Sequence, residues 1–161
     1  MALWARHGAL LSLLLGLGAF LVDRGQKFYQ IDIAGWRGGE VVPVTSFFNY
    51  ILIWNRGISY GFLSGLPQYM ILALVAAAMI LLVVWWLKAD TFLVKAGLAL
   101  ALGGAASNAL DRYLWGGVAD FFHFFINGWS FYVFNLADVS ISIGAGLLIV
   151  DLLVPKKDGT V

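Results

Sequence analysis

The sequence predicts an all-α membrane protein with four transmembrane helices and a small β-sheet at the membrane surface. Three observations favour this fold class. The 161 residues are 61% hydrophobic and 12% charged, with a mean hydropathy of +0.88, which is far from a soluble composition. Four apolar runs approach the length of a membrane span, and a segment rich in strand-forming residues separates the first two runs. A chain of this length suits one domain, so we expect residues 1–161 to form a single membrane-embedded unit.

The four apolar runs cover about residues 8–26, 69–87, 92–110 and 136–154. A helix of about 20 apolar residues crosses a bilayer, so each run predicts one span. The first run follows Arg6 and His7, as the apolar region of a secretory signal would. Because no small-residue cleavage site follows it and three further runs come later, we expect it to remain as the first span.

Residues 27–68, between the first two spans, predict the sheet. Val, Thr, Phe, Tyr and Ile dominate positions 41–54, and these residue types are typical of strands. The block Asn55-Arg56-Gly57 follows them, and glycines then punctuate the chain. We therefore expect a sheet or hairpin that rests on the membrane. The aromatic residues suited to a membrane interface are Trp36, Trp54, Tyr60, Trp115 and Trp129.

Basic residues predict the orientation of the spans. Four spans place both termini and the connection 88–95 on one side, with residues 23–68 and 111–134 opposite. Each side carries the same number of Lys and Arg residues, but the terminal side packs them into much shorter segments. Short loops weigh most in the positive-inside rule, so we expect cytoplasmic termini. The terminal side holds Arg6, Lys88, Lys95, Lys156 and Lys157, and the opposite side holds Arg24, Lys27, Arg37, Arg56 and Arg112.

Small residues crowd the third and fourth apolar runs. Such residues let helix backbones approach closely in lipid. We therefore expect the outer ends of these two spans to lie together. The residues concerned are Gly97, Gly103, Gly104, Ala105, Ala106, Ser107, Gly144 and Gly146.

Asp120 and Asp138 lie beside apolar runs, where a carboxylate is costly unless it is paired, hydrated or used. Asp120 stands among apolar residues, and burial there would raise its pKa; a solvated loop aspartate is the alternative. Asn135 and Asp138 have the spacing of a capping box, so Asp138 alone favours a helix cap. Two carboxylates with pKa values pushed apart can share a proton and activate a water. His123 is either a partner of Asp120 or a surface residue.

A second polar group lies at the end of the third run. Asn108 has i, i+3 and i+4 spacing to Asp111 and Arg112, which places it on one helix face with both. These residues indicate either a polar site or an interhelical hydrogen bond with a snorkelling arginine. Asp23 and Lys27 have i, i+4 spacing, which predicts an ordinary helix ion pair.

Absent and rare residue types exclude several chemistries. The chain has no cysteine, which excludes disulfides, thiol nucleophiles and thiolate metal sites. Its two histidines are far apart, and no serine stands in a GxSxG context. Ser59 and Ser107 have only Lys27 as an obvious base. A net charge of +1 without a basic block does not favour nucleic acid. We expect a monomer with no metal, no organic cofactor and no nucleic-acid partner.

Five blocks of the sequence resemble the signature blocks of bacterial lipoprotein signal peptidases, the type II or prolipoprotein signal peptidases. In chain order they are Asp23 with Lys27, Asn-Arg-Gly-Ile-Ser-Tyr-Gly at 55–61, Gly-Gly-Ala-Ala-Ser-Asn-Ala-Leu-Asp-Arg at 103–112, Gly-Val-Ala-Asp-Phe at 117–121 and Phe-Asn-Leu-Ala-Asp at 134–138. The second block departs from the family, because many members carry Thr or Tyr in place of Arg56 and Ala-Ala-Phe in place of residues 58–60.

This resemblance implies a four-helix membrane aspartyl endopeptidase with an extracytoplasmic β-sheet cradle and a short interfacial helix, the latter within the outer segment 111–134. It implies removal of signal peptides from diacylglyceryl-modified prolipoproteins in the bacterial inner membrane, by cleavage just before the lipidated cysteine. By position, Asp120 and Asp138 would be catalytic. Asn55, Asn108, Arg112 and Asn135 would bind substrate or support the site, and Asp23, Lys27 and Asp111 would be structural.

Two other functions fit parts of the sequence. A membrane adaptor would use the acids as caps and ion pairs, and it would keep its function after Asp→Asn changes. A proton-coupled transporter would carry acids in the middle of its spans. Asp120 and Asp138 lie at span ends instead, which disfavours the transporter.

Overall fold

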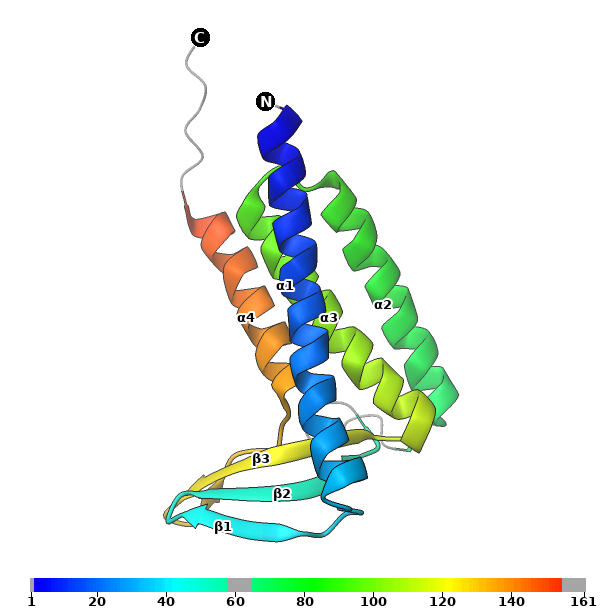
Figure 1. The fold of residues 1–161 in the computed structure, drawn as a ribbon, viewed down its shortest axis with the longest axis vertical. Coiled ribbons are helices and arrows are strands. Elements are labelled where there is room, and N and C mark those ends of the chain that lie inside the picture. Colours follow the sequence, from blue (N-terminus) through cyan, green and yellow to red (C-terminus); the bar gives the residue numbers. More distant parts are fainter. Residues whose placement is uncertain (1, 58–64, 155–161) are drawn as a thin grey trace.

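Four long helices and one antiparallel sheet make up the part of the chain described by the computed structural model, residues 2–57 and 65–154 (Figure 1). The helices are α1 (Ala2–Phe28), α2 (Gln68–Lys88), α3 (Phe92–Trp115) and α4 (Leu136–Leu153). Each is long and apolar enough to cross a membrane. The predicted fold class with four spans is therefore confirmed. The predictions that involve Ser59, Tyr60, Lys156 and Lys157 fall outside the described residues.

The ends of α3 follow from capping chemistry. Thr91 is its N-cap, because its Oγ1 accepts a hydrogen bond from Val94 N at 3.2 Å. Gly116 closes the helix with a φ of 70°, a left-handed conformation that glycine adopts without steric cost. The helix therefore ends at Trp115 rather than at the predicted residue 110. Helix α1 also extends beyond its apolar run and continues as a π-helical segment, η1 (Tyr29–Ile33).

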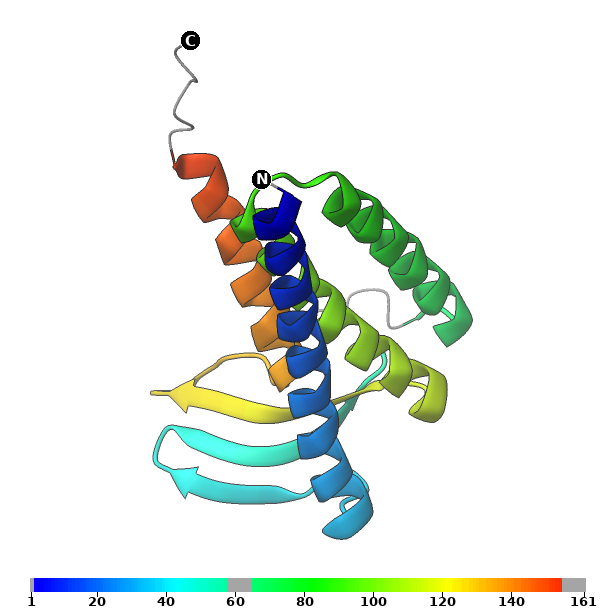
Figure 2. The same cartoon turned by 45° about the horizontal axis from the view of Figure 1, so that its top comes forward.

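Helix α3 is the centre of the bundle. It packs against the other three helices, with α2 and α4 on opposite sides of it (Figures 1 and 2). A Cβ on Gly97 would lie 2.7 Å from the carbonyl oxygen of Gly144, and a Cβ on Gly104 would overlap the carbonyl of Ala137. The predicted close contact between the third and fourth spans is thus confirmed. Gly103 differs from this prediction, because it faces α1 instead.

The sheet lies across the end of the bundle where α1 ends and α4 begins (Figure 1). Its strands are β1 (Val41–Thr45), β2 (Phe48–Asn55), β3 (Val118–Ile126) and β4 (Trp129–Ser130), in the spatial order β1-β2-β3-β4. The predicted sheet from residues 41–54 is therefore confirmed as β1 and β2. The expectation of a loop with a short helix at 111–134 is wrong, because this segment forms the last turn of α3 and the strands β3 and β4.

A small aromatic core joins the sheet to the bundle. Leu52 and Phe121 are fully buried at its centre, together with Ala119 and Ile31. Three of the tryptophans predicted for the membrane interface pack against this core instead: Trp36, Trp54 and Trp115. Aromatic rings bury a large apolar area, so they stabilise a sheet whose own core of buried residues is small. Trp129 is 60% exposed, as an interfacial residue would be.

Candidate active site

Asp120 is placed by the pairing of β2 with β3. In this antiparallel register Ile53 lies opposite Asp120, and Asn55 lies opposite Val118. Asp120 is only 3% exposed, and two amides donate hydrogen bonds to its carboxyl group. Asn55 Nδ2 lies 3.0 Å from Oδ2, and Asn135 Nδ2 lies 2.7 Å from Oδ1. The strand thus turns Asp120 inward, toward the start of α4.

Asp138 lies in the first turn of α4, and the predicted capping box is present. Asn135 Oδ1 accepts from Asp138 N at 2.9 Å, while Asn135 N donates to Asp138 Oδ2 at 3.3 Å. The other oxygen of the carboxylate, Oδ1, accepts from Asn108 Nδ2 at 2.9 Å. Asp138 is therefore a helix cap and also part of a wider polar cluster, so the two interpretations of this residue do not compete.

Asn135 joins the two aspartates. It is fully buried, and its amide nitrogen donates to Asp120 while its backbone and side-chain oxygen hold Asp138. The same amide nitrogen also lies 3.0 Å from Asn108 Oδ1. Asn135 thus holds the carboxyl group of Asp120 on β3 and that of Asp138 on α4 close to each other.

A cavity of about 170 Å³ opens between these groups. Asp120 and Asp138 both line it, together with Asn55, Asn108 and Arg112, so five of the six residues predicted as catalytic or supporting share one cavity. The sixth, Asn135, lies behind the aspartates as the residue that positions them. Apolar lining comes from the inner turns of the bundle, namely Val75, Ala105, Ala109 and Ile141.

Burial sets the protonation of Asp120. The pKa of Asp120 is raised to about 7; loss of hydration is the largest cause, and the nearby charge of Asp138 also raises it. The hydrogen bond from Asn55, the charge of Lys27 and the hydrogen bond from Asn135 act in the opposite direction. At neutral pH this carboxyl group can therefore both hold and release a proton, as a general acid must.

Arg112 is 7% exposed and has internal partners. One terminal nitrogen donates to the carbonyl oxygen of Gly57 at 2.5 Å, and the other donates to Gln68 Oε1 at 3.2 Å. Gln68 in turn donates to the carbonyl of Arg56 at 2.5 Å. The guanidinium thus fixes the chain on both sides of residues 58–64 while it lines the cavity.

Asp23 and Lys27 form the predicted ion pair, with Nζ 2.7 Å from Asp23 Oδ2. The sequence did not indicate how far this pair extends. Lys27 also lies 2.5 Å from Asp111 Oδ2, and Asp111 pairs with Arg24. Ser107 Oγ donates to Asp23 at 2.6 Å and so is not a nucleophile activated by Lys27. The i, i+4 spacing revealed one contact, but the tertiary partners come from α3, which no local pattern specifies.

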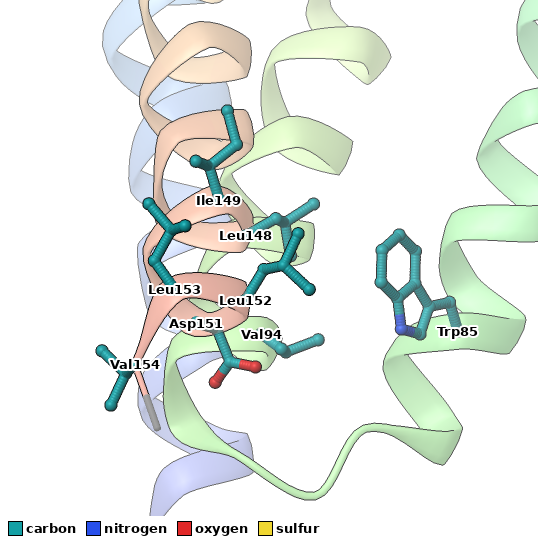
Figure 3. Close-up of a pocket in the computed structure, with 8 residues that line it drawn as sticks. All are labelled: Trp85, Val94, Leu148, Ile149, Asp151, Leu152, Leu153 and Val154. Atoms are coloured by element: carbon teal, nitrogen blue, oxygen red, sulfur yellow. The ribbon is translucent and has the colours of Figure 1, made fainter. Parts of the chain in front are cut away.

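Two further groups lie away from the aspartates. His123 Nε2 contacts Ser130 Oγ at 2.6 Å on β4, so it is a surface residue and not a partner of Asp120. A larger cavity of about 710 Å³ lies at the opposite end of the bundle, between α2 and the last turns of α4 (Figure 3). Its lining is apolar apart from Asp151, which accepts a hydrogen bond from Thr91 at 2.7 Å. Within the described residues, no cluster of three or more His, Asp or Glu side chains is suited to a metal ion.

The family model and the relatives that match this chain are both described as signal peptidases. Residues 15–154 match the family model of signal peptidase (SPase) II. A lipoprotein signal peptidase of Rhodopseudomonas palustris (strain TIE-1) is 42% identical, with 89% of this chain and 92% of the relative covered. One from Methylobacterium radiotolerans is 38% identical, with 94% and 90% covered. A bacterial membrane enzyme solved by the in meso method at 2.3 Å resolution has a TM-score of 0.78 at 30% identity, with 89% of this chain and 87% of that chain covered.

Proposed function

This chain belongs to the signal peptidase II family, and we propose that it is an aspartic endopeptidase that removes signal peptides from diacylglyceryl-modified prolipoproteins. Cleavage falls just before the lipidated cysteine. The observation that carries this proposal is the pair Asp120 and Asp138, which meet in one polar cavity at the end of a membrane-spanning bundle. The family accounts for the substrate class, and the paired carboxyl groups account for the aspartic mechanism.

The two carboxyl groups have different roles in this proposal. Asp120 carries the proton, because burial raises its pKa to about 7. Asp138 is the base, since it lies at a helix N-terminus, where the helix dipole complements a negative charge. A water between them loses a proton to Asp138 and attacks the carbonyl carbon of the scissile bond. Asp120 gives its proton to the carbonyl oxygen, and a tetrahedral diol forms.

Collapse of this diol completes the reaction. The carbon–nitrogen bond breaks, and the proton held by Asp138 moves to the departing amine of the lipidated cysteine. One hydroxyl of the diol returns its proton to Asp120 as the new carboxyl group forms on the signal peptide. Both aspartates end in their starting states, so no cofactor enters the reaction.

The amides and Arg112 hold this arrangement. Asn55 and Asn135 fix the Asp120 carboxyl, and Asn108 fixes Asp138. Arg112 has five N–H donors, of which two contact Gly57 and Gln68. A remaining donor that faces the cavity can bind a carbonyl oxygen of the substrate peptide.

The membrane position follows from the substrate. A diacylglyceryl group is too apolar to leave lipid at low cost, so the lipid enters sideways between helices. We place the chain in the bacterial inner membrane with both termini in the cytoplasm. The sheet and the two aspartates then lie at the extracytoplasmic surface, where exported prolipoproteins arrive.

The direct test uses a diacylglyceryl prolipoprotein with purified wild type, Asp120→Asn and Asp138→Asn in detergent. We expect each variant to lose at least about 10³-fold in cleavage rate, because a single carboxyl group cannot both donate and accept the proton. Both variants should still melt cooperatively. Substantial cleavage by either variant would exclude the aspartic mechanism, and a wild type that binds partners but never cleaves would favour the adaptor.

A further inference from the structure

Lys27 is a fully buried cation with a partner for each of its three ammonium protons. Its Nζ lies 2.7 Å from Asp23 Oδ2, 2.5 Å from Asp111 Oδ2 and 3.2 Å from Asn108 Oδ1. Asp23 comes from α1 with Lys27 itself, while Asn108 and Asp111 come from consecutive turns of α3. A single charged atom therefore ties three side chains together in the interior.

The two carboxylates that hold Lys27 reach the backbone beside the active aspartates. Asp23 Oδ1 accepts a hydrogen bond from Ala137 N at 2.9 Å, and Ala137 directly precedes Asp138. Asp111 Oδ2 accepts from Ala119 N at 3.2 Å, and Ala119 directly precedes Asp120. Each active aspartate is thus preceded by an amide that is anchored to the same cation through one carboxylate.

The third contact of Lys27 sets the orientation of an amide. An ammonium group only donates, so it must face the oxygen of the Asn108 amide. The amide nitrogen of Asn108 then faces Asp138, to which it donates at 2.9 Å. The same Asn108 oxygen accepts from Asn135 Nδ2, which also donates to Asp120. Lys27 is therefore one of two donors, with Asn135 Nδ2, that hold the Asn108 amide with its nitrogen toward Asp138, and it is the charged one of the two.

We propose that Lys27 is a positioning residue that fixes the relative placement of Asp120 and Asp138 through Asp23, Asp111 and Asn108. This inference rests on the proposed catalytic function of the two aspartates. Lys27 does not line the cavity and makes no described contact with Asp120 or Asp138, so it acts through the side chains that it holds, of which Asn108 lines the cavity.

Arg24 provides a matched control on the same helix. It also pairs with Asp111, and its guanidinium lies 5.2 Å from the centre of the Trp115 ring. The described contacts of Arg24 do not include Asp23 or Asn108, so its loss removes a partly buried ion pair and leaves the anchor at Ala137 intact. A purely structural ion pair predicts that Lys27→Met and Arg24→Met lose activity in proportion to stability.

The experiment measures melting temperature, kcat, KM and the pH profile of kcat/KM for both variants with a diacylglyceryl prolipoprotein. We expect Lys27→Met to lose kcat on the order of 10²-fold with little change in KM, as a small misplacement of reacting groups does. We expect less than about 10-fold for Arg24→Met. The pH profile of Lys27→Met should also move to higher pH, because the charge of Lys27 lowers the pKa of Asp120.

A second variant keeps the test decisive if Lys27→Met does not fold. In Lys27→Met with Asp23→Asn, one buried charge of each sign is removed, and the amide oxygen at position 23 can still accept from Ala137 N. A folded double variant should show the same loss of kcat, since Asn108 still lacks its cation. Near-normal kcat in this variant, or equal losses for Lys27→Met and Arg24→Met at equal melting temperature, would overturn the inference. Failure of the wild type to cleave would instead refute the proposed function.

Discussion

Asp120 differs from the other buried carboxylates in the partners it has. Asp111 is fully buried beside two cations, Lys27 and Arg24, whereas the described hydrogen bonds to Asp120 come from neutral amides. Hydrogen bonds from amides offset only part of the desolvation cost of Asp120, and the remaining cost favours the protonated form. The same fold thus surrounds one buried acid with cations and leaves the other with neutral hydrogen-bond donors and a pKa of about 7.

The raised pKa of Asp120 makes stability depend on pH. The pKa is about 7 in the folded protein against a model value of 3.8, so the folded state binds a proton that the unfolded state has already lost between these values. The contribution of Asp120 to the free energy of unfolding is therefore fully present below about pH 4. It falls by about 4 kcal/mol as the pH rises toward 7. The charged groups that act on Asp120 are Asp138, Lys27 and Arg112. We expect Asp120→Asn to abolish this decline, which unfolding of both proteins at pH 5 and pH 8 measures. Parallel pH dependence in the two proteins would contradict the assignment.

Asn55 should matter through the single hydrogen bond that it gives Asp120. This bond lowers the pKa of Asp120, so Asn55→Ala should raise the pKa further and leave the carboxyl less well oriented. We expect kcat to fall roughly 10- to 100-fold, the equivalent of one hydrogen bond to a charged group. Asn49→Ala, on the same strand but opposite His123, is the control and should cleave normally. Equal kinetics for the two variants would remove Asn55 from the site.

At the scale of elements, the contact between α3 and α4 decides where Asp138 lies. The N-terminal turn of α4 rests on Gly104, where an added Cβ would overlap the carbonyl of Ala137. Any side chain there must displace the turn that carries Asp138. Gly104 therefore allows both the close packing of α3 on α4 and the observed position of Asp138.

Gly104→Ala tests this contact. We expect a loss of about 1–3 kcal/mol in unfolding free energy from overpacking, with a loss of activity that exceeds it. Gly146→Ala is the matched control on α4, because a Cβ there meets no described atom within 4 Å. That variant should be as stable as the wild type or slightly more so, since alanine favours helix. A Gly104→Ala enzyme with normal kcat would separate the packing of α4 from the placement of Asp138.

The elements that the sequence predicted are those with strong periodic or compositional signals. The four spans and the sheet from residues 41–54 were of this kind, as were the Asn135–Asp138 capping box and the Asp23–Lys27 pair. Strand β3 was missed although six of its nine residues, Val118 to Ile126, are Val, Ile or Phe. Its apolar composition resembles that of a membrane-resting loop, and only pairing with β2 distinguishes the two. The anchors from Asp23 to Ala137 and from Asp111 to Ala119 could not be predicted, because they join residues far apart in sequence.

At the scale of the molecule, the cavity with Asp120 and Asp138 lies at the sheet end, and the outward surface of the bundle is mostly apolar. The exposed large side chains of α2 and α4 are Leu, Ile, Val, Trp, Tyr and Met, apart from Lys88 at the end of α2, as lipid contact requires. The structure therefore has two ends of different chemistry, and the orientation in the membrane decides which compartment the cavity serves.

The absence of cysteine allows this orientation to be measured with single thiols. Asp32→Cys lies in η1 at the sheet end, and Asp90→Cys lies between α2 and α3 at the other end; both positions are exposed. We expect an impermeant thiol reagent to label Asp32→Cys in intact spheroplasts and to label Asp90→Cys only after permeabilisation, because the short connection carries the denser positive charge. The parent protein is the unlabelled control. Labelling in the reverse order would place the aspartates in the cytoplasm and exclude exported substrates.

The order of the elements along the chain also bears on biosynthesis. Asp120 arrives on β3, but Asn135 and Asp138 arrive only with the last helix, and Ala137 must then find Asp23 on the first. Until α4 has inserted against α3, the nascent chain holds one isolated carboxyl group and no partner to exchange a proton with. Under the proposed mechanism, hydrolytic competence therefore coincides with completed insertion of α4, so a partly inserted chain should not cleave prolipoproteins.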